Sequence, residues 1–278
     1  MFTYKSRFLT RAEVWFEEEP GNTCGVDWLF YACRSSPVPR TKWRHCYTSM
    51  IDLTQSTDRL WSRLTTDTAY KIRRARDKEH ISCELIDAAK PAVLDEFERM
   101  YNGFALLKGL LPLDRGRIQS MVRAGALDVS VAKDAQDKVV VFHANYRNRH
   151  RASQLFLPSL YRKCADSATR NAMGRANRYL FWANILRYKE QGLQCFDFGG
   201  WYMGANTEMI KINEFKRGFG GDVVREYKCE QVLTRKGWVV LAVANLLNRT
   251  RTFACLPKQS AQKEVYESAP IREVSASI

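Results

Sequence analysis

The order of strands and helices after residue 126 is the feature that most restricts how this chain can fold. Residues 126–133 alternate apolar and polar side chains, and residues 139–146 form a second strand pattern after a short polar connection, which predicts a β-hairpin. We expect the following elements next: a strand at 151–157, a helix at about 174–190, a strand at 193–198, a helix at 207–217, a strand at 223–233 and a helix at 237–247. This order predicts a mixed α/β fold in which helices pack on a sheet.

The first half of the chain carries weaker patterns. Residues 45–53 are typical of a strand, a helical stretch begins at residue 57, and residues 82–86 alternate like a short strand. Pro91 opens another helix, because proline fits the first helical turn. Residues 1–40 show turn signals without a clear periodic element.

The charge balance favours an anionic partner. The chain has 44 lysine and arginine residues against 30 aspartate and glutamate residues, which gives a formal net charge of +14. Partners that match this charge are a nucleic acid, a phosphorylated cofactor or an acidic membrane surface. The alternative is that the charge only keeps the protein in solution.

Neither a metal site nor a membrane span is expected. The eight cysteines form no CxxC pair, and no second histidine stands at metal-ligand spacing from His143. The sequence has no run of eighteen apolar residues and no apolar signal core after its basic N-terminal residues. We therefore expect a cytoplasmic protein that uses no metal.

Three segments resemble one protein family. They are residues 49–54 with the basic helix at 70–76, residues 176–182 with the strand end Asp197-Phe198-Gly199-Gly200, and residues 212–221, which contain Phe215 and Lys216 before a glycine cluster. In order and spacing they resemble FemAB-like proteins and related acyltransferases of the Gcn5-related N-acetyltransferase (GNAT) superfamily. The resemblance covers about residues 45–233, and residues 212–221 are its most specific part.

The resemblance implies an α/β (α+β) GNAT-like fold, with a mixed, mostly antiparallel central sheet flanked by helices. Residues 111–256 are expected to form the GNAT-like acyltransferase domain, residues 1–110 an α/β region that is a candidate for a truncated GNAT-like half, and residues 257–278 a flexible tail. The chain departs from the family in two respects. Its first 125 residues are short for a full first GNAT domain, and residues 170–176 stand in the place of the pyrophosphate loop with one residue too many.

The resemblance also implies an enzyme. Its members move an acyl or aminoacyl group onto an amine, so we expect an N-acyltransferase that uses acyl-CoA as donor and a small molecule or cell-envelope precursor as acceptor. A FemAB-type enzyme that takes its group from aminoacyl-tRNA is the alternative, and tRNA is then a partner. A non-catalytic RNA-binding protein with a GNAT-like shell is a further alternative, suggested by the net charge.

Two residues are the candidate catalytic groups under this resemblance. Lys216, in the Phe215-Lys216 pair, is expected to stabilise the oxyanion that forms during acyl transfer. It could instead be a solvated lysine at a helix C-terminus, where a cation is favourable. Asp197 is expected to act as a general base or to anchor the attacking amine. Its alternative is a turn carboxylate that accepts hydrogen bonds from the backbone.

The candidate binding residues are Phe215, next to Lys216, and three further groups. Gly199, Gly200, Gly218, Gly220 and Gly221 allow close backbone approach, either to a ligand or within a turn. Trp201 and Tyr202 are expected to line the acceptor pocket, or else to cover the core. Tyr70, Arg73 and Arg74 lie on the basic helix, where they are expected to bind phosphate groups, unless they form an ordinary charged face.

Overall fold

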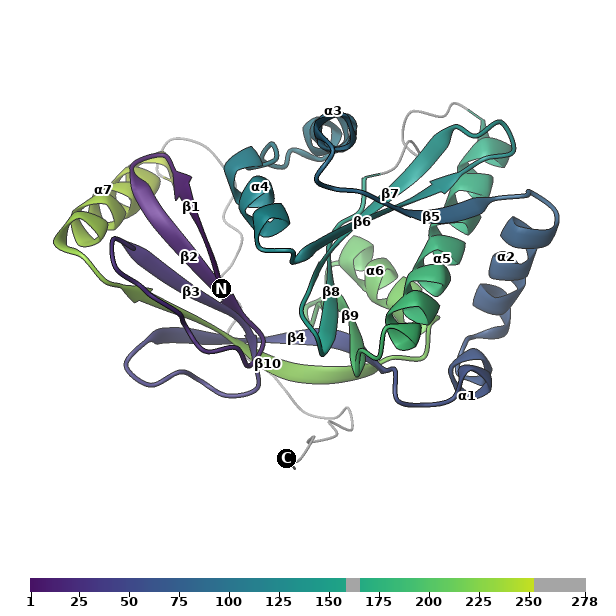
Figure 1. Cartoon of the computed structure of the whole chain (residues 1–278), viewed down its shortest axis with the longest axis horizontal. Helices are drawn as coiled ribbons and strands as arrows, with labels where there is room; N and C mark the ends of the chain where they lie inside the picture. Colours follow the sequence, from purple (N-terminus) through teal and green to yellow (C-terminus); the bar gives the residue numbers. More distant parts are fainter. Residues whose placement is uncertain (159–165, 253–278) are drawn as a thin grey trace. The chain divides into compact units, whose positions relative to one another are not determined.

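The computed structural model describes residues 1–158 and 166–252, and it contains two compact units (Figure 1). Among the described residues, unit 1 combines Met1–His45 with the segment from Glu226 to Thr252, and unit 2 is formed by the segment Cys46–Arg225. These limits differ from the boundary at residues 110–111 that the sequence suggested. The relation of residues 1–110 to a truncated GNAT domain stays a prediction, and the expected tail at 257–278 lies outside the described residues.

Unit 1 is a small sheet with one helix. Its elements are β1 (Phe2–Ser6), β2 (Leu9–Trp15), β3 (Trp28–Arg34), most of β10 (Asp222–Val232) and α7 (Arg235–Thr252). β1 and β2 form a hairpin, β2 and β3 run parallel, and β3 and β10 are antiparallel. The sequence showed only turn signals in residues 1–40 because burial does not alternate along these strands. In β2, for example, the four consecutive residues from Ala12 to Trp15 are all buried, which gives no period of two.

Unit 2 holds a six-stranded sheet in the order β4-β9-β8-β7-β6-β5. The strands are β4 (Lys42–Asp52, which enters the unit at Cys46), β5 (Ser82–Ile86), β6 (Leu127–Lys133), β7 (Val139–Arg147), β8 (Arg151–Phe156) and β9 (Cys195–Gly200). The described pairs are antiparallel except β8 with β9, which run parallel. The mixed, mostly antiparallel sheet and the hairpin β6–β7 confirm the sequence prediction.

Helices cover both faces of this sheet. The helices of unit 2 are α1 (Thr57–Ser62), α2 (Thr66–Asp77), α3 (Pro91–Lys108), α4 (Arg115–Arg123), α5 (Ser167–Glu190) and α6 (Thr207–Arg217). Val141 of β7 packs in one core cluster with Leu180 of α5, whereas the next residue, Phe142, contacts Phe97 of α3. Successive residues of a strand point to opposite faces, so α5 and α3 lie on opposite sides of the sheet. No helix among the described residues is long and apolar enough to cross a membrane.

Local side chains explain where the helices differ from the expected limits. Asp166 caps α5 by accepting a hydrogen bond from the backbone N–H of Thr169 at 2.7 Å, so the helix begins at Ser167 rather than near residue 174. Residues 170–176 are therefore helical, and the departure from a regular pyrophosphate loop that the sequence showed corresponds to a helix. Thr65 caps α2 and divides the expected helical stretch in two. The helix α4 was not predicted.

Candidate functional site

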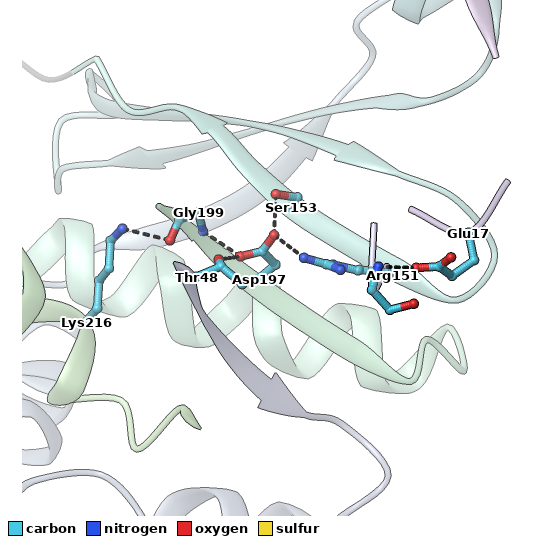
Figure 2. A network of polar contacts seen from close by, with 8 residues as sticks. Glu17, Thr48, Arg151, Ser153, Asp197, Gly199 and Lys216 are labelled. Atoms are coloured by element: carbon cyan, nitrogen blue, oxygen red, sulfur yellow. Dashed lines mark hydrogen bonds and ion pairs between the residues drawn. The ribbon is translucent and has the colours of Figure 1, made fainter. Parts of the chain in front are cut away.

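The parallel strands β8 and β9 separate at the centre of the unit 2 sheet. Their last paired residues are Ser153 and Asp197. Beyond this point, β9 continues beside β4, where Gly200 pairs with Thr48. The divergence leaves the end of β9 as a place where backbone groups and side chains from several strands meet (Figure 2).

Asp197 is completely buried at this divergence, and both of its carboxylate oxygens are occupied. Oδ1 accepts hydrogen bonds from the Thr48 hydroxyl and, at 2.7 Å, from the backbone N–H of Gly199. Oδ2 accepts from Arg151 Nη2 at 2.6 Å and from Ser153 Oγ at 2.8 Å. Two donors on each oxygen use about all the lone-pair directions that a carboxylate offers.

The surroundings of Asp197 keep it ionised. Burial by itself raises the pKa of the carboxyl, but the charge of Arg151 and the hydrogen bonds from Thr48, Arg151 and Ser153 lower it further than burial raises it. The net shift of the pKa is downward. A carboxylate of low pKa with four bound donors is a poor proton acceptor, so the geometry favours the structural alternative for Asp197 over a general base.

Lys216 lies at the other side of Gly199. Its ammonium group donates to the carbonyl oxygens of Gly199, at 3.0 Å, and Gly200, at 2.5 Å. The side chain is 8% exposed, so the alternative of a solvated lysine at the helix end is wrong. Burial lowers the pKa of Lys216 from 10.5 to about 8, against an upward effect of the Asp197 charge. The two bonds leave one N–H of the ammonium without a partner among the described residues.

Packing around α6 fixes the position of Lys216. The helix begins where the Asn206 side chain accepts from the backbone N–H groups of Glu208 and Met209. Near its end, the Phe215 ring packs against Phe181 of α5 at 5.6 Å between ring centroids. Phe215 is therefore part of the aromatic core that holds α6 in place, and its neighbour Lys216 points to the end of β9.

Trp201 and Tyr202 continue from β9 and are both half-buried. The backbone of Tyr202 exchanges two hydrogen bonds with the side chain of Asn213, at 3.0 and 2.6 Å, which ties this segment to α6. The guanidinium of Arg217 lies 5.5 Å from the centre of the Trp201 ring. Both residues thus border the β9–α6 region, while their contact with an acceptor stays a prediction.

Three of the predicted glycines are explained by packing within the chain. A Cβ atom would lie 2.4 Å from Thr68 Oγ1 at Gly218, 2.4 Å from the Arg63 carbonyl oxygen at Gly220 and 2.8 Å from Ser49 Oγ at Gly221. These glycines let the turn after α6 approach α1, α2 and β4. Gly199, whose φ of +73° also favours glycine, shapes the backbone between Asp197 and Lys216.

The fold can be compared with solved structures. The crystal structure of FemX has a TM-score of 0.55 with this chain at 11% sequence identity, and the match covers 75% of this chain and 73% of that one. The chain has the FemX fold.

Weaker similarities to other solved structures accompany the FemX match. The structure of L-PGS from Bacillus licheniformis matches at 13% identity over 78% of this chain and 72% of that one, with a TM-score of 0.47. An aminoglycoside acetyltransferase from an uncultured soil metagenomic sample matches at 15% identity over 50% of this chain and 86% of that one, with a TM-score of 0.36. No protein-family model and no curated protein sequence matches the chain.

In this FemX-like fold, the basic residues of α2 border an open groove of about 570 Å³. The groove is lined by Tyr70, Arg73, Arg74, Asp77 and Lys78. Arg74 bonds to the Tyr70 hydroxyl at 3.1 Å and pairs with Glu79, whereas the guanidinium of Arg73 lies 5.7 Å from the Trp61 ring centre. The structure thus brings Tyr70, Arg73 and Arg74 together on one helix, apart from the Asp197 cluster.

Several residues of the candidate site were not predicted. Thr48, Arg151 and Ser153 come from three separate segments, and only the strand pairing shows that they meet at Asp197. Arg178 of α5 was also missed. Its guanidinium lies 4.8 Å from the Phe215 ring centre and donates a hydrogen bond to the Gly174 carbonyl oxygen at 3.0 Å. Its Nε is buried and has no partner among the described residues. Spacing alone could not single out an arginine within a long helix.

Proposed function

We propose that this chain is an N-acyltransferase that moves an acyl group from an activated donor, acyl-CoA, to an amine of a small molecule or a cell-envelope precursor. The observation that carries the proposal is the buried Lys216 ammonium at the point where the parallel strands β8 and β9 diverge, within a FemX fold. Burying an ammonium group is unfavourable, and the two backbone carbonyls that bind it carry no counter-charge, so a lysine with a lowered pKa at this place favours a chemical role.

The chemistry needs a cation beside a developing negative charge. The nitrogen lone pair of the acceptor attacks the carbonyl carbon of the donor, the bond to the leaving sulfur or oxygen breaks, and the amine loses a proton to the leaving group or to solvent. Lys216 keeps one N–H free of partners among the described residues, and this N–H is the donor for the oxyanion. Fixing the ammonium through Gly199 and Gly200 aligns it before the reaction begins.

Asp197 has a positioning role in this proposal. Its carboxylate holds the N–H of Gly199, and Gly199 in turn holds the ammonium of Lys216. The negative charge of Asp197 also favours the protonated form of Lys216. No step requires Asp197 to accept a proton, in agreement with its lowered pKa and its four donors.

The phosphate groups of the donor are assigned to the basic residues of α2. Arg73, Arg74 and Lys78 line one groove with Tyr70, and a single carboxylate, Asp77, lies among them. CoA carries phosphates that such a groove can bind, and so does tRNA, which keeps the aminoacyl-tRNA-dependent FemAB-type reaction as the second candidate. The same net charge of +14 supports both donors.

The test uses the purified full chain and follows each donor directly. We expect acetyl-CoA to raise the melting temperature and mass spectrometry to detect acyl transfer to a small amine. Stabilisation and transfer with aminoacyl-tRNA alone would select the second candidate. If neither donor is turned over while RNA binds with a steep salt dependence, the chain is an RNA-binding protein with a GNAT-like shell and the proposal is wrong.

A further inference from the structure

Unit 1 contains a groove of about 560 Å³ that shares no residue with the site described above. It is lined by Trp28, Arg40, Lys42, Glu230, Gln231, Val232, Trp238, Leu241 and Ala242. One part of this lining is apolar and aromatic, and another part is cationic. A groove of this composition suits a ligand that has both an apolar portion and an anionic group.

Trp28, which lines this unit 1 groove, carries an unsatisfied polar group. Its indole Nε1–H is buried and has no hydrogen-bond partner among the described residues. The guanidinium of Arg11 lies 4.3 Å from the centre of the same ring. A buried donor without a partner is unfavourable, so the described residues leave this wall of the groove with an unsatisfied polar group.

The helix α7, which forms one wall of the groove, presents apolar side chains to solvent. Trp238, Val239 and Val243 are 65%, 63% and 51% exposed. The sequence of α7 contains no acidic residue, and Arg235 opens its first turn. An exposed apolar helix surface that carries tryptophan and basic residues is typical of helices that lie at the surface of a bilayer.

The start of α7 is held rigidly within unit 1. The Thr234 hydroxyl donates to Asp27 at 2.6 Å and accepts from the backbone N–H of Gly237 at 3.0 Å. Lys236 Nζ bonds to the other oxygen of Asp27 at 3.1 Å. The exposed apolar residues are therefore presented on a fixed helix rather than on a loose end.

We propose that unit 1 docks on the surface of a membrane that contains anionic phospholipids. Trp238, Val239 and Val243 enter the boundary between headgroups and acyl chains, and Arg40 and Lys42 bind the anionic headgroups. The charge of the chain matches such a surface, and the groove takes one lipid, whose phosphate lies near Arg40 and Lys42 and whose apolar portion lies along Trp28 and Leu241. Glu230 is the single acidic residue among those that line the groove.

Charge complementarity selects a lipid surface over a protein partner. A purely apolar partner would leave Arg40 and Lys42 without counter-charges, while a soluble anion would leave the exposed residues of α7 in water. A bilayer with anionic headgroups satisfies both. Each basic residue near such a surface contributes about 1 kcal/mol of attraction, which corresponds to about a fivefold change in binding.

The experiment is co-sedimentation of the full chain with vesicles of phosphatidylcholine alone or of phosphatidylcholine mixed with phosphatidylglycerol. We expect binding to the mixed vesicles, at least about tenfold weaker binding to the neutral ones, and loss of binding at high salt. Val239→Asp should weaken binding to the mixed vesicles about tenfold or more, because it places a charge in the apolar boundary. Arg40→Gln with Lys42→Gln should reduce binding by about tenfold or more.

Leu106→Asp is the matched control, since Leu106 is 83% exposed and lies on α3 in unit 2. It should bind vesicles like the unchanged chain, and circular dichroism should show that all variants are folded. Equal binding to neutral and anionic vesicles, or equal loss in Leu106→Asp and Val239→Asp, would overturn the proposal. Displacement of the protein from vesicles by glycerol phosphate at constant ionic strength would assign the groove to a soluble anion. Binding of single-stranded RNA without vesicle binding would assign it to nucleic acid. Either result contradicts a membrane surface.

Discussion

Asp197 and Lys216 are connected through a single residue, Gly199. The backbone N–H of Gly199 donates to Asp197 Oδ1 at 2.7 Å, and its carbonyl oxygen accepts from Lys216 Nζ at 3.0 Å (Figure 2). The two charges therefore bind opposite ends of one glycine. This arrangement couples the position of the proposed catalytic cation to a buried carboxylate that does not itself react.

Replacing Asp197 by asparagine should destabilise the fold strongly. The change removes the charge that pairs with the buried Arg151 guanidinium, and breaking one partner of a buried ion pair costs about 3–5 kcal/mol. Urea denaturation measures this loss of unfolding free energy. Asp77→Asn is the control, because Asp77 is exposed and pairs with Arg76 at the surface, where the loss should be below about 1 kcal/mol.

The same carboxylate predicts the effect of acid on stability. The pKa of Asp197 is lower in the folded chain than in the unfolded one, so the carboxylate stabilises the fold above its unfolded pKa. That contribution is lost as the pH falls through the lower, folded pKa. The acid-induced loss of unfolding free energy should therefore be smaller in Asp197→Asn than in the unchanged chain, and equal losses in both would contradict this account.

Alanine substitutions at two glycines can distinguish the cost of backbone strain from the cost of a packing clash. Gly220 and Gly192 have similar φ angles, +74° and +80°, so alanine is strained by about 1 kcal/mol at either position. A Cβ at Gly220 would lie 2.4 Å from the Arg63 carbonyl oxygen, whereas nothing lies within 4 Å at Gly192. Gly220→Ala should therefore cost about 1–3 kcal/mol more than Gly192→Ala in thermal unfolding. Equal losses would show that the turn after α6 is not tightly packed.

The basic groove of α2 predicts a salt-dependent donor affinity. Arg73→Gln with Arg74→Gln should weaken the binding of acetyl-CoA about tenfold and reduce the effect of salt on that binding. Isothermal titration measures both quantities. Arg99→Gln is the control, since its side chain is 79% exposed and lies on α3. A donor affinity that is unchanged in the double variant would place the phosphates elsewhere.

The lowered pKa of Lys216 predicts how the rate depends on pH. If the ammonium stabilises the oxyanion, the rate of acyl transfer should fall as the pH rises through about 8. The measurement needs an acceptor amine that stays uncharged over the whole pH range. A rate that rises through pH 8 would instead indicate that Lys216 acts as a base. The free energy of unfolding should instead increase with pH. Between about pH 8 and 10.5 the unfolded chain holds more protons than the folded one, so the penalty for burying the ammonium is relieved as the pH rises across this range.

The sequence predicted the hairpin of unit 2 well because two apolar segments, β6 and β7, are separated by a short polar turn. The limits of α6, Thr207–Arg217, agree with the prediction, since a polar cap and a glycine mark its ends. The start of α5 was missed because Asp166 caps it eight residues before Gly174, and a glycine inside a helix looks like a boundary.

The candidate site was predictable only in part. Lys216, Asp197 and the glycines of β9 could be identified because the resemblance is concentrated in short contiguous segments. The groups that set their chemistry could not: Thr48 and Arg151 are 149 and 46 residues from Asp197 in the sequence, and only strand pairing brings them together. The lowered pKa of Asp197, which disfavours its predicted role as a base, depends on these distant partners.

The most direct test of the account is the rate of acyl transfer by Lys216→Met under single-turnover conditions with saturating donor. Methionine matches the lysine side chain as far as Cε and lacks the ammonium, so we predict a fall of about a hundredfold or more with a folded protein and an unchanged donor affinity. Lys216→Arg should recover part of the rate. Transfer by Lys216→Met at the rate of the unchanged chain would contradict the central claim that this buried cation stabilises the transition state.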